Sequence, residues 1–442
     1  MDFVNGLLRG LLGLVVILGI AFLFSNNRRT VNWRTVGAGL LLQIILAVLI
    51  LKGSAMGAFF APLGWPKLFF SWVSSFFVLV LDFTTAGARF IFGDLALSPG
   101  VDGSLGNFFA FQVLPTIIFF GSLMAILYHL GVMQRVVHGM AWLVTRFLGT
   151  SGAESLSVTA NIFVGQTEAP LVIRPFLERM THSELMAVMT GGMATIAGGV
   201  MVAYIQFLGN AFAQAQGLAL DAARLQFAEH LLGASLMAAP AALVLAKIII
   251  PEIGQPETGG TVKIAIEKDS KNVIDAAASG AADGLKLALN VGAMLIAFLA
   301  LIAMINAILG WGSGLFGADL TLQQLLGWAL APLAWLIGVP AADITVFGSL
   351  IGLKVVANEF VAYEQLAGAI GAGGLSPKTI IMATFALCGF ANFSSIAIQI
   401  GGIGPLAPSR KSELAQLGIR AVLAGTLANM MTATIAGVLV GS

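Results

Sequence analysis

Apolar runs recur from one end of this chain to the other, and each is long enough, at about 17–25 residues, to cross a bilayer as a helix. The 442 residues are 58% hydrophobic and only 10% charged, whereas a soluble domain carries about 25% charged residues. The 53 glycines suit the close packing of helices within a bilayer. We therefore predict an all-α polytopic membrane protein in contact with the lipid bilayer.

The apolar runs predict about eight transmembrane helices. They lie at about 7–24, 36–51, 108–130, 184–208, 227–250, 285–309, 379–400 and 414–439. A further apolar run at 69–92 carries Asp82 and Arg89, so we expect it to lie partly along the membrane interface. The loops on one side of these spans hold most of the Lys and Arg residues, which places both termini outside the cytoplasm.

One short stretch, residues 161–170 (NIFVGQTEAP), places polar side chains in a chain that is otherwise apolar. A glutamate in a span costs roughly 2.5–3.5 kcal/mol on insertion scales, so Glu168 is expected to bind or move something. The apolar arms at about 152–164 and 170–180 are each too short to cross a bilayer. We predict a re-entrant helical hairpin that enters the membrane and returns on the same side.

The order of hairpin, broken span and intact span occurs twice, at about 152–250 and 324–440. Each hairpin tip carries an amide and a glutamate, and each broken span carries a hydroxyl before Ile-Ala. These residues are Gln166 with Glu168, Asn358 with Glu359, and Thr195 and Ser395. An odd number of crossings separates the copies, so they form an inverted repeat, which is typical of secondary transporters with a site where the repeats meet.

Broken helices at membrane depth leave backbone N–H and carbonyl groups free. Carbonyl, hydroxyl and amide oxygens together suit a hard cation such as Na⁺. The sequence offers such a set in Asn161, the carbonyl of Val164, Thr195 and the carbonyl of Ile196. These four residues are candidate ligands of a coupling ion.

The remaining polar side chains at the tips and breaks offer hydrogen-bond donors and acceptors. They are Gln166, Thr167, Glu168, Asn358, Glu359, Asn392 and Ser395. Neither Lys nor Arg sits at the tips, which favours a neutral substrate rich in hydroxyls or amides over an anion. The alternatives are hydroxyls that bond only to their own helix, Asn392 as a contact between helices, and Phe390 as a packing residue. Asp343 is expected to cap a hairpin end.

Several classes of function receive no support. The net charge of +1 gives no case for a nucleic-acid partner. The chain has no HExxH or GxSxG motif and no Cys/His cluster with metal-ligand spacing. We therefore expect that the protein is not an enzyme and uses no organic cofactor.

Four motifs resemble those of the concentrative nucleoside transporter family. They are GQTEAPLVIRP at 165–175, MATIAG at 193–198, NEFVAY at 358–363 and CGFANFSSI at 388–396. Their order and sequence are highly specific, and the resemblance covers nearly the whole chain. The chain resembles a bacterial member of the family with eight spans.

The resemblance implies a homotrimer in which each protomer has a scaffold domain and a moving transport domain. The scaffold would hold spans 1–3 with the interfacial helix (1–131) and span 6 (285–311). The transport domain would hold the first repeat (132–250) and the second repeat (324–442). A cytoplasmic linker (251–284) would follow the first repeat.

The resemblance also implies roles for individual residues. The residues that would contact the nucleobase are Gln166, Thr167 and Glu168, with Val200 and Phe390 packed near it. The residues that would bind the ribose hydroxyls are Glu359, Asn392 and Ser395. The implied Na⁺ ligands are Asn161, Val164, Thr195 and Ile196, and the hydroxyl at 195 comes from Ser in some relatives.

We expect a cation-coupled importer of nucleosides that works by alternating access in the bacterial inner membrane, with Na⁺ as the coupling ion. Two alternatives remain. The coupling ion is H⁺, as in some bacterial members, or the substrate is another neutral polar solute such as a nucleobase.

Overall fold

The computed structural model describes residues 2–99, 101–259 and 270–441, and within these ranges the chain is helical and contains no strand. The prediction of an all-α fold is therefore confirmed. In chain order the α-helices are α1 Asp2–Leu23, α2 Trp33–Leu51, α3 Gly53–Phe59, α4 Trp65–Phe92, α5 Phe109–Gln112, α6 Leu114–His129, α7 Val132–Leu148, α8 Gly152–Ala160, α9 His182–Ala194, α10 Gly198–Gln216, α11 Leu220–Ile249, α12 Val273–Gly314, α13 Leu322–Leu336, α14 Ile344–Val356, α15 Glu359–Gly371, α16 Pro377–Leu387, α17 Phe393–Ile403 and α18 Lys411–Val440.

Eight helical segments of the described chain are long and apolar enough to cross a membrane. Seven of them coincide with expected spans, and the eighth is the segment Ala61–Ala96. The span at 379–400 is divided between α16 and α17, as its predicted break requires, and each half has only 11 residues. The number of long apolar segments equals the predicted number of spans. The set of eight includes Ala61–Ala96, however, and leaves out residues 379–400.

The segment expected along the membrane interface, residues 69–92, belongs to the 28-residue helix α4. A helix of that length reaches across a bilayer at 1.5 Å per residue. The charges at Asp82 and Arg89 suggested an interfacial position, but they leave long apolar stretches uninterrupted. By length and composition, α4 therefore resembles the spans, and its interfacial placement stays a prediction.

The sixth span is longer than expected, because α12 has 42 residues and begins at Val273. The side chain of Asn272 accepts a hydrogen bond from the backbone N–H of Asp275 and so caps the first turn. Residues 273–284, which we expected in the linker, are therefore helical. The charged positions 263 and 268 of the linker lie outside the described residues.

Hairpin 1 consists of α8, a tip of turns, and a 3-10 helix, η4, at Ala169–Arg179. A capping box between Ser151 and Glu154 starts α8. The returning arm is a 3-10 helix in which Pro170 and Pro175 cannot donate backbone hydrogen bonds. Both arms are too short to cross a bilayer, as predicted.

Hairpin 2 begins later than the expected start of the second copy at about 324. The arms are α14 and α15, and α13 is a separate helix with its own capping box at Thr321. Asn358 caps α15 at the tip by accepting a hydrogen bond from the N–H of Val361. Each hairpin is thus preceded by one more helix, α7 or α13, which extends the internal repeat.

Both predicted helix breaks are present. The first separates α9 from α10 at Thr195, which is extended with φ −116° and ψ 169°. The second separates α16 from α17, and the side chain of Asn392 caps α17 by accepting a hydrogen bond from the N–H of Ser395 at 2.9 Å. In both breaks the free backbone groups are buried in the protein or line its cavity, the two settings in which a membrane tolerates them.

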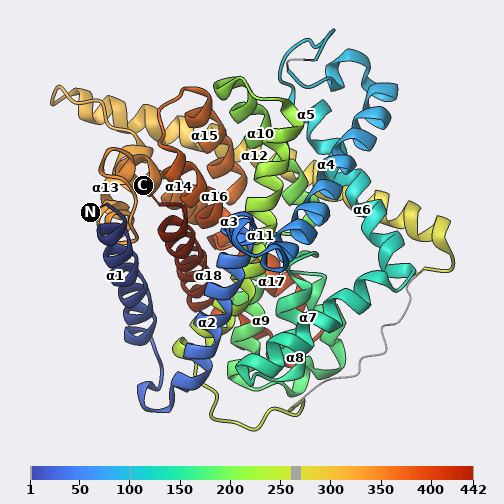
Figure 1. The fold of residues 1–442 in the computed structure, drawn as a ribbon, viewed down its shortest axis with the longest axis vertical. Helices are drawn as coiled ribbons and strands as arrows, with labels where there is room; N and C mark the ends of the chain where they lie inside the picture. The colour runs from blue at the N-terminus through green and yellow to red at the C-terminus, as the bar shows by residue number, and fades with distance from the viewer. Residues whose placement is uncertain (1, 100, 260–269, 442) are drawn as a thin grey trace.

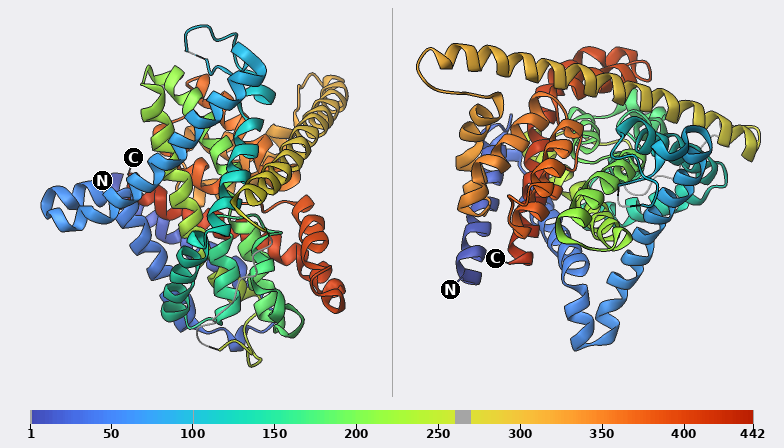
Figure 2. Two further views of the ribbon diagram at one scale, coloured as in Figure 1. Left: turned by 90° about the vertical axis from the view of Figure 1, so that its right-hand side faces the viewer. Right: turned by 90° about the horizontal axis from the view of Figure 1, so that it is seen from above.

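The helices of the repeats form the centre of the molecule. In the apolar 18-residue windows of these helices, 89% of the segment that holds α9 and α10 and 94% of α11 is buried, whereas only 17% of the window in α12 is covered. Figure 1 shows α11 running through the middle of the bundle, and Figure 2 shows the long α12 along one flank. The two termini lie close together at one side of the molecule, and the loop between α1 and α2 lies below them (Figure 1).

The second break requires glycine at position 389. A Cβ atom built on Gly389 would lie 2.8 Å from the carbonyl oxygens of Met193 and Ala194 and would also strike the side chain of Asn429. We expect Gly389→Ala to lower stability by about 1–3 kcal/mol, because these neighbours cannot move aside. Gly401→Ala is the control, since a Cβ there meets nothing within 4 Å. Equal melting temperatures for both variants in detergent would contradict this packing.

Candidate functional site

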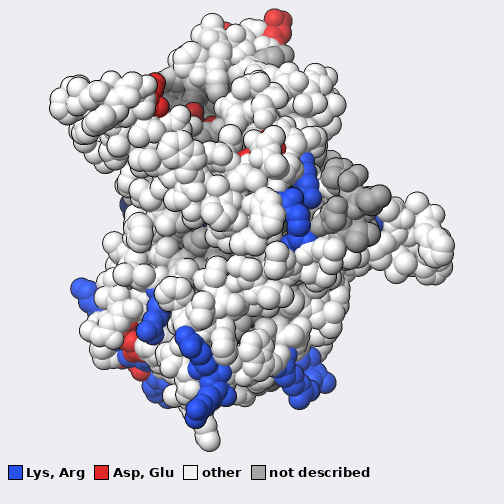
Figure 3. All heavy atoms as spheres, turned by 90° about the vertical axis from the view of Figure 1, so that its left-hand side faces the viewer, with Lys and Arg blue, Asp and Glu red and all other residues white. Residues whose placement is uncertain are grey.

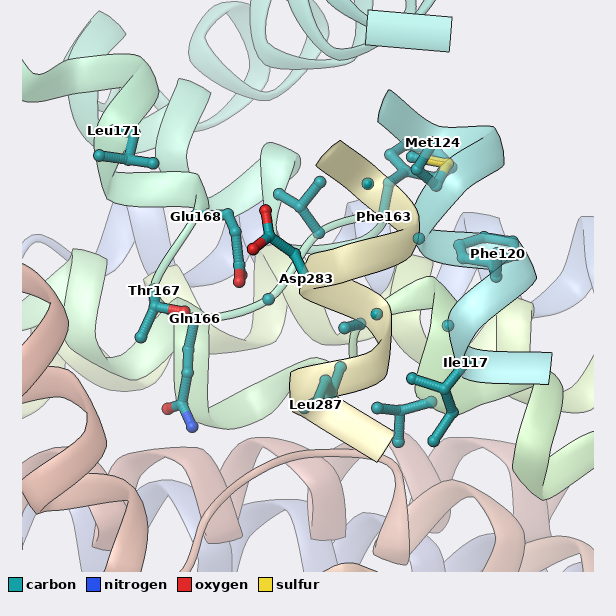
Figure 4. Close-up of a pocket in the computed structure, with 18 of the residues that line it drawn as sticks. Ile117, Phe120, Met124, Phe163, Gln166, Thr167, Glu168, Leu171, Asp283 and Leu287 are labelled. Carbon is teal, nitrogen blue, oxygen red and sulfur yellow. The ribbon is translucent and has the colours of Figure 1, made fainter. Parts of the chain in front are cut away.

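A cavity of about 1030 Å³ lies where the two hairpin tips meet the starts of α10 and α17. Its other wall comes from α6 and α12, which contribute apolar side chains such as Ile117, Phe120 and Leu287 (Figure 4). A cavity of this size is typical of small-molecule sites. It therefore lies between the two repeats on one side and the helices α6 and α12 on the other.

All eight residues predicted to bind substrate line this cavity. From hairpin 1 and the start of α10 they are Gln166, Thr167, Glu168 and Val200, and from hairpin 2 and the second break they are Glu359, Phe390, Asn392 and Ser395. Residues separated by more than 200 positions in the sequence thus meet in one place. Tip 1 reaches the second break through Gln166 and Ser395, and tip 2 bonds the same break through Glu359 and Asn392.

The four candidate ion ligands are arranged differently. Only Val164 lines the cavity, whereas Asn161, Thr195 and Ile196 are buried behind the hairpin tip. The oxygen Oδ1 of Asn161 is buried without a hydrogen-bond partner in the described chain, and such an orphaned acceptor is suited to a cation. Thr195 donates to the carbonyl of Gly191 at 2.8 Å, as a hydroxyl bonded to its own helix would, and its lone pairs stay available.

Glu359 lies at the centre of a cluster of buried polar side chains at the start of α15. Its two carboxylate oxygens accept hydrogen bonds from the hydroxyl of Tyr204 at 3.2 Å and from Nδ2 of Asn392 at 3.0 Å. Tyr204 is held by the ring of Tyr363, whose centroid lies 4.2 Å away. A carboxylate accepts about four hydrogen bonds, so Glu359 retains acceptor capacity for a ligand.

Gln166 links hairpin 1 to the second repeat. Its amide Nε2 donates to Oγ of Ser395 at 3.1 Å, and its Oε1 accepts from Nε2 of Gln399 at 3.0 Å. Gln399 also donates to the carbonyl of Met189 in α9. The residue expected on the nucleobase side therefore touches a residue expected on the ribose side, and the two halves of the site form one network.

Three helices, α10, α15 and α17, begin at the wall of the cavity. Helix N-termini carry free N–H groups and about half a positive charge, which favours electronegative ligand atoms. The carboxylate of Glu359 lies at one of these starts, and the side chain of Asn392 caps another. The helix starts thus place N–H groups at the wall of the cavity, whose basic lining residues, Arg174 and His129, lie outside the two tips.

Glu168 faces a more open part of the cavity than Gln166 does. Its side chain is exposed, and Figure 4 shows it extending into the same region as Asp283 of α12. A Cβ on Gly165 would collide with Oε2 of Glu168, so the carboxylate lies back over the backbone of the tip. Thr167 packs its methyl group against Gly402, where a Cβ would lie 2.5 Å away.

Several polar residues of this region were not singled out from the sequence. They are Tyr204, Lys354, Gln399 and Asn429, and each is buried with hydrogen-bond partners far away along the chain. Each is a polar side chain inside an apolar span, which marks a functional candidate in membrane proteins. That signal was present, but it does not identify the partners. The capping role expected for Asp343 is also different, because its Oδ2 accepts from Ser376 and Thr379 of α16 and not from its own helix.

Three family models match the chain. The model described as "Na+ dependent nucleoside transporter C-terminus" matches residues 230–437, and the corresponding N-terminus model matches residues 12–95. A model described as "Nucleoside recognition" matches residues 110–211. Together they cover most of the chain.

Relatives are similar over nearly the full length. An uncharacterized transporter, YutK of Bacillus subtilis, is 47% identical over 98% of this chain and 99% of its own. The nucleoside permease NupC of Helicobacter pylori is 42% identical over 97% of both chains. Sodium/nucleoside cotransporter 1 of Rattus norvegicus is 41% identical over 97% of this chain and 63% of that longer protein.

Solved structures share the fold. CNTnw in an inward-facing substrate-bound state is 45% identical, covers 98% of both chains and has a TM-score of 0.85. A variant of the same protein in an outward-facing state is 44% identical, covers 98% of this chain and 97% of its own, and also has a TM-score of 0.85. The described structure is thus that of a multi-pass membrane transporter rather than an enzyme, and the chain belongs to the concentrative nucleoside transporter family.

Proposed function

We propose that this chain is a Na⁺-coupled importer of nucleosides that works by alternating access. The observation that carries the proposal is the meeting of both hairpin tips in one cavity lined by amides, hydroxyls and carboxylates. No basic side chain lies at either tip, which suits a neutral, hydroxyl-rich substrate. The relatives named for nucleoside transport support the same substrate class.

The polar network suggests how a nucleoside binds. Glu359 and Asn392 accept and donate hydrogen bonds at the starts of α15 and α17, where ribose hydroxyls would displace part of their mutual contact. Gln166 would read the base through its amide, with Thr167, Glu168, Val200 and Phe390 around it. Ser395 lies between the two groups, since it already bonds Gln166, and would contact the sugar.

Na⁺ would bind behind hairpin 1, between α8 and the first break. Its ligands would be Oδ1 of Asn161, the hydroxyl of Thr195 and the carbonyls of Val164 and Ile196. A nucleoside is neutral, so one cation moves one net charge inward with each substrate. At about 100 mV that charge supplies roughly 2.3 kcal/mol. This supports accumulation on the order of 50-fold before the Na⁺ gradient is added.

The direction of the cavity supports an inward-facing state. From the tips it extends to Tyr128, His129 and Ser270, which border the loops expected on the cytoplasmic side. Alternating access would move the two repeats, 132–250 and 324–442, against a scaffold formed by 1–131 and 285–311. The cavity lies at that boundary, as required of a site that opens to either side.

The protein would lie in the bacterial inner membrane as a homotrimer with both termini outside the cytoplasm. On the face shown in Figure 3, most Lys and Arg residues gather at the lower end, which is the end with the loop between α1 and α2. Basic residues favour the cytoplasmic side. The exposed apolar surface of α12 offers a large area for contact with lipid or other protomers.

Competition for uptake of labelled uridine into proteoliposomes tests the substrate class. Uridine and adenosine are expected to compete strongly, and ribose or uracil alone at least tenfold more weakly, because each fills only part of the hydrogen-bonding network. Competition by uracil as strong as that by uridine would identify a nucleobase transporter instead. Failure of all four compounds would point to another neutral polar solute.

A further inference from the structure

A single buried cluster joins the two helix breaks. Lys354, in the last turn of α14, has no exposed surface, and its Nζ donates to the carbonyl of Ala386 at 2.9 Å and to Oδ1 of Asn429 at 2.6 Å. The Nδ2 of Asn429 donates at 2.7 Å to the carbonyls of Ala194 and Cys388. These carbonyls belong to the C-terminal ends of α9 and α16.

Lys354 has no carboxylate within 4 Å among the described residues. A buried ammonium without compensation costs several kcal/mol, so something else has to stabilise it. The C-terminal end of a helix carries about half a negative charge and free carbonyls. Here the ends of α9 and α16 meet at one point, and the ammonium is placed where their negative ends converge.

The two repeats correspond closely around this point. In the first repeat α8 packs on α9, and in the second α14 packs on α16. A serine–carboxylate hydrogen bond ties the starts of these helices in both copies, but its direction is reversed. Ser151 of the hairpin arm donates to Glu184 at 2.5 Å in the first copy, and Ser376 at the start of the broken helix donates to Asp343 of the hairpin arm at 2.6 Å in the second. The end of the first hairpin arm therefore faces the first half of the broken helix in both copies.

At this junction the two repeats differ in chemistry. In the first, Asn161 caps the end of α8 and its Oδ1 is a buried acceptor without a partner, beside the break at Thr195. In the second, Lys354 at the end of α14 brings a donor to the carbonyl of Ala386, beside the break at Cys388. One junction presents an acceptor and the other a cation.

We propose that the ammonium of Lys354 is a resident cation, which takes in the second repeat the place that the transported Na⁺ takes in the first. The inference rests on the proposed Na⁺ site and deepens it. Because one of the two related positions is filled by the protein itself, the transporter binds a single free cation for each substrate. Lys354 is thus a positioning residue, which acts through Asn429 on both breaks.

Uridine binding measured over a range of Na⁺ concentrations, with choline as the replacement, tests this proposal. Wild-type binding is expected to be first order in Na⁺. Lys354→Ala leaves room for an ion, and its binding is expected to fall at least tenfold at low Na⁺ and to become second order. Lys354→Met fills that room without charge and is expected to bind at least tenfold more weakly at every Na⁺ concentration. Lys378→Met, on the exterior start of α16, is the control and should match wild type.

Three results would overturn the inference. The first is second-order Na⁺ dependence, or two charges moved per uridine, in the wild type. The second is uridine binding by Lys354→Met that equals wild type. The third is a folded Lys354→Ala variant whose uridine binding stays weak at every Na⁺ concentration. If neither variant folds, the charge count of the wild type decides the question. If wild-type binding ignores Na⁺, the proposed coupling ion is wrong. The proposal of a resident cation is then tested by melting temperature. Adding Na⁺ or K⁺ should raise the melting temperature of Lys354→Ala more than that of the wild type.

Discussion

Glu359→Gln is expected to lower the rate of uridine uptake by about 100-fold or more. The carboxylate receives one donor at each oxygen, from Tyr204 and Asn392, and is 3% exposed. Glutamine keeps only one acceptor and turns an N–H₂ group toward one of these donors. Hydrogen bonds to a charged group contribute about 1.5–3 kcal/mol each, and about 1.4 kcal/mol corresponds to a tenfold change.

Glu364→Gln is the matched control, because Glu364 lies on the same helix with its side chain exposed. Its uptake is expected to stay near wild type. Uptake should be compared at equal amounts of folded protein, verified by gel filtration in detergent. If Glu359→Gln transported uridine at the wild-type rate, the proposed role of Glu359 in binding the ribose would be wrong.

Asn161→Ala is expected to make the affinity for uridine independent of Na⁺. In the wild type, replacing choline with Na⁺ should raise uridine affinity at least tenfold, within the usual range of about 5–150-fold for coupled sites. The variant loses the buried, unpartnered Oδ1 of Asn161, so its affinity should be the same in both salts. The measurement is equilibrium binding of labelled uridine in detergent.

Ser157→Ala is the control for this experiment. Ser157 lies on α8 one turn before Asn161, and its hydroxyl is also buried without a partner in the described chain. The variant removes a comparable unpartnered polar group from the same helix and should keep the full Na⁺ effect. Loss of the Na⁺ effect in Ser157→Ala but not in Asn161→Ala would place the ion elsewhere.

The fold could be predicted largely from interruptions in an apolar sequence. Polar or Gly-rich stretches around Thr195 and at 388–396 break helices that would otherwise cross the bilayer, and both breaks are where the sequence indicated. The role of α13 was missed because Leu322–Leu336 is as short and apolar as a hairpin arm. Only the capping box at Thr321 distinguishes it, and a cap does not reveal which helices pair.

The lining of the site was predictable because its residues form local motifs. The contacts among them were not, because they join distant segments: Gln166 meets Ser395, and Lys354 meets Asn429. A single polar residue in a span indicates that a partner exists but not where it lies. The cluster beneath the breaks therefore required the three-dimensional arrangement.

The pair of helix breaks also explains why substrate and ion can be coupled. The backbone N–H of Phe390 donates to the carbonyl of Thr195 at 3.3 Å, and Asn429 joins the ends of α9 and α16. An ion bound at the proposed site beside the first break would therefore act on the segment that we propose to contact substrate at the second. Such coupling requires only a shared two-state element and no long pathway.

Uptake of labelled uridine into proteoliposomes, with the membrane potential clamped at zero, tests the central claim most directly. An inward Na⁺ gradient is expected to accumulate uridine above its external concentration, and collapse of that gradient should release it. Uptake that is independent of the Na⁺ gradient and is driven by an inward H⁺ gradient would contradict Na⁺ coupling. It would identify H⁺ as the coupling ion.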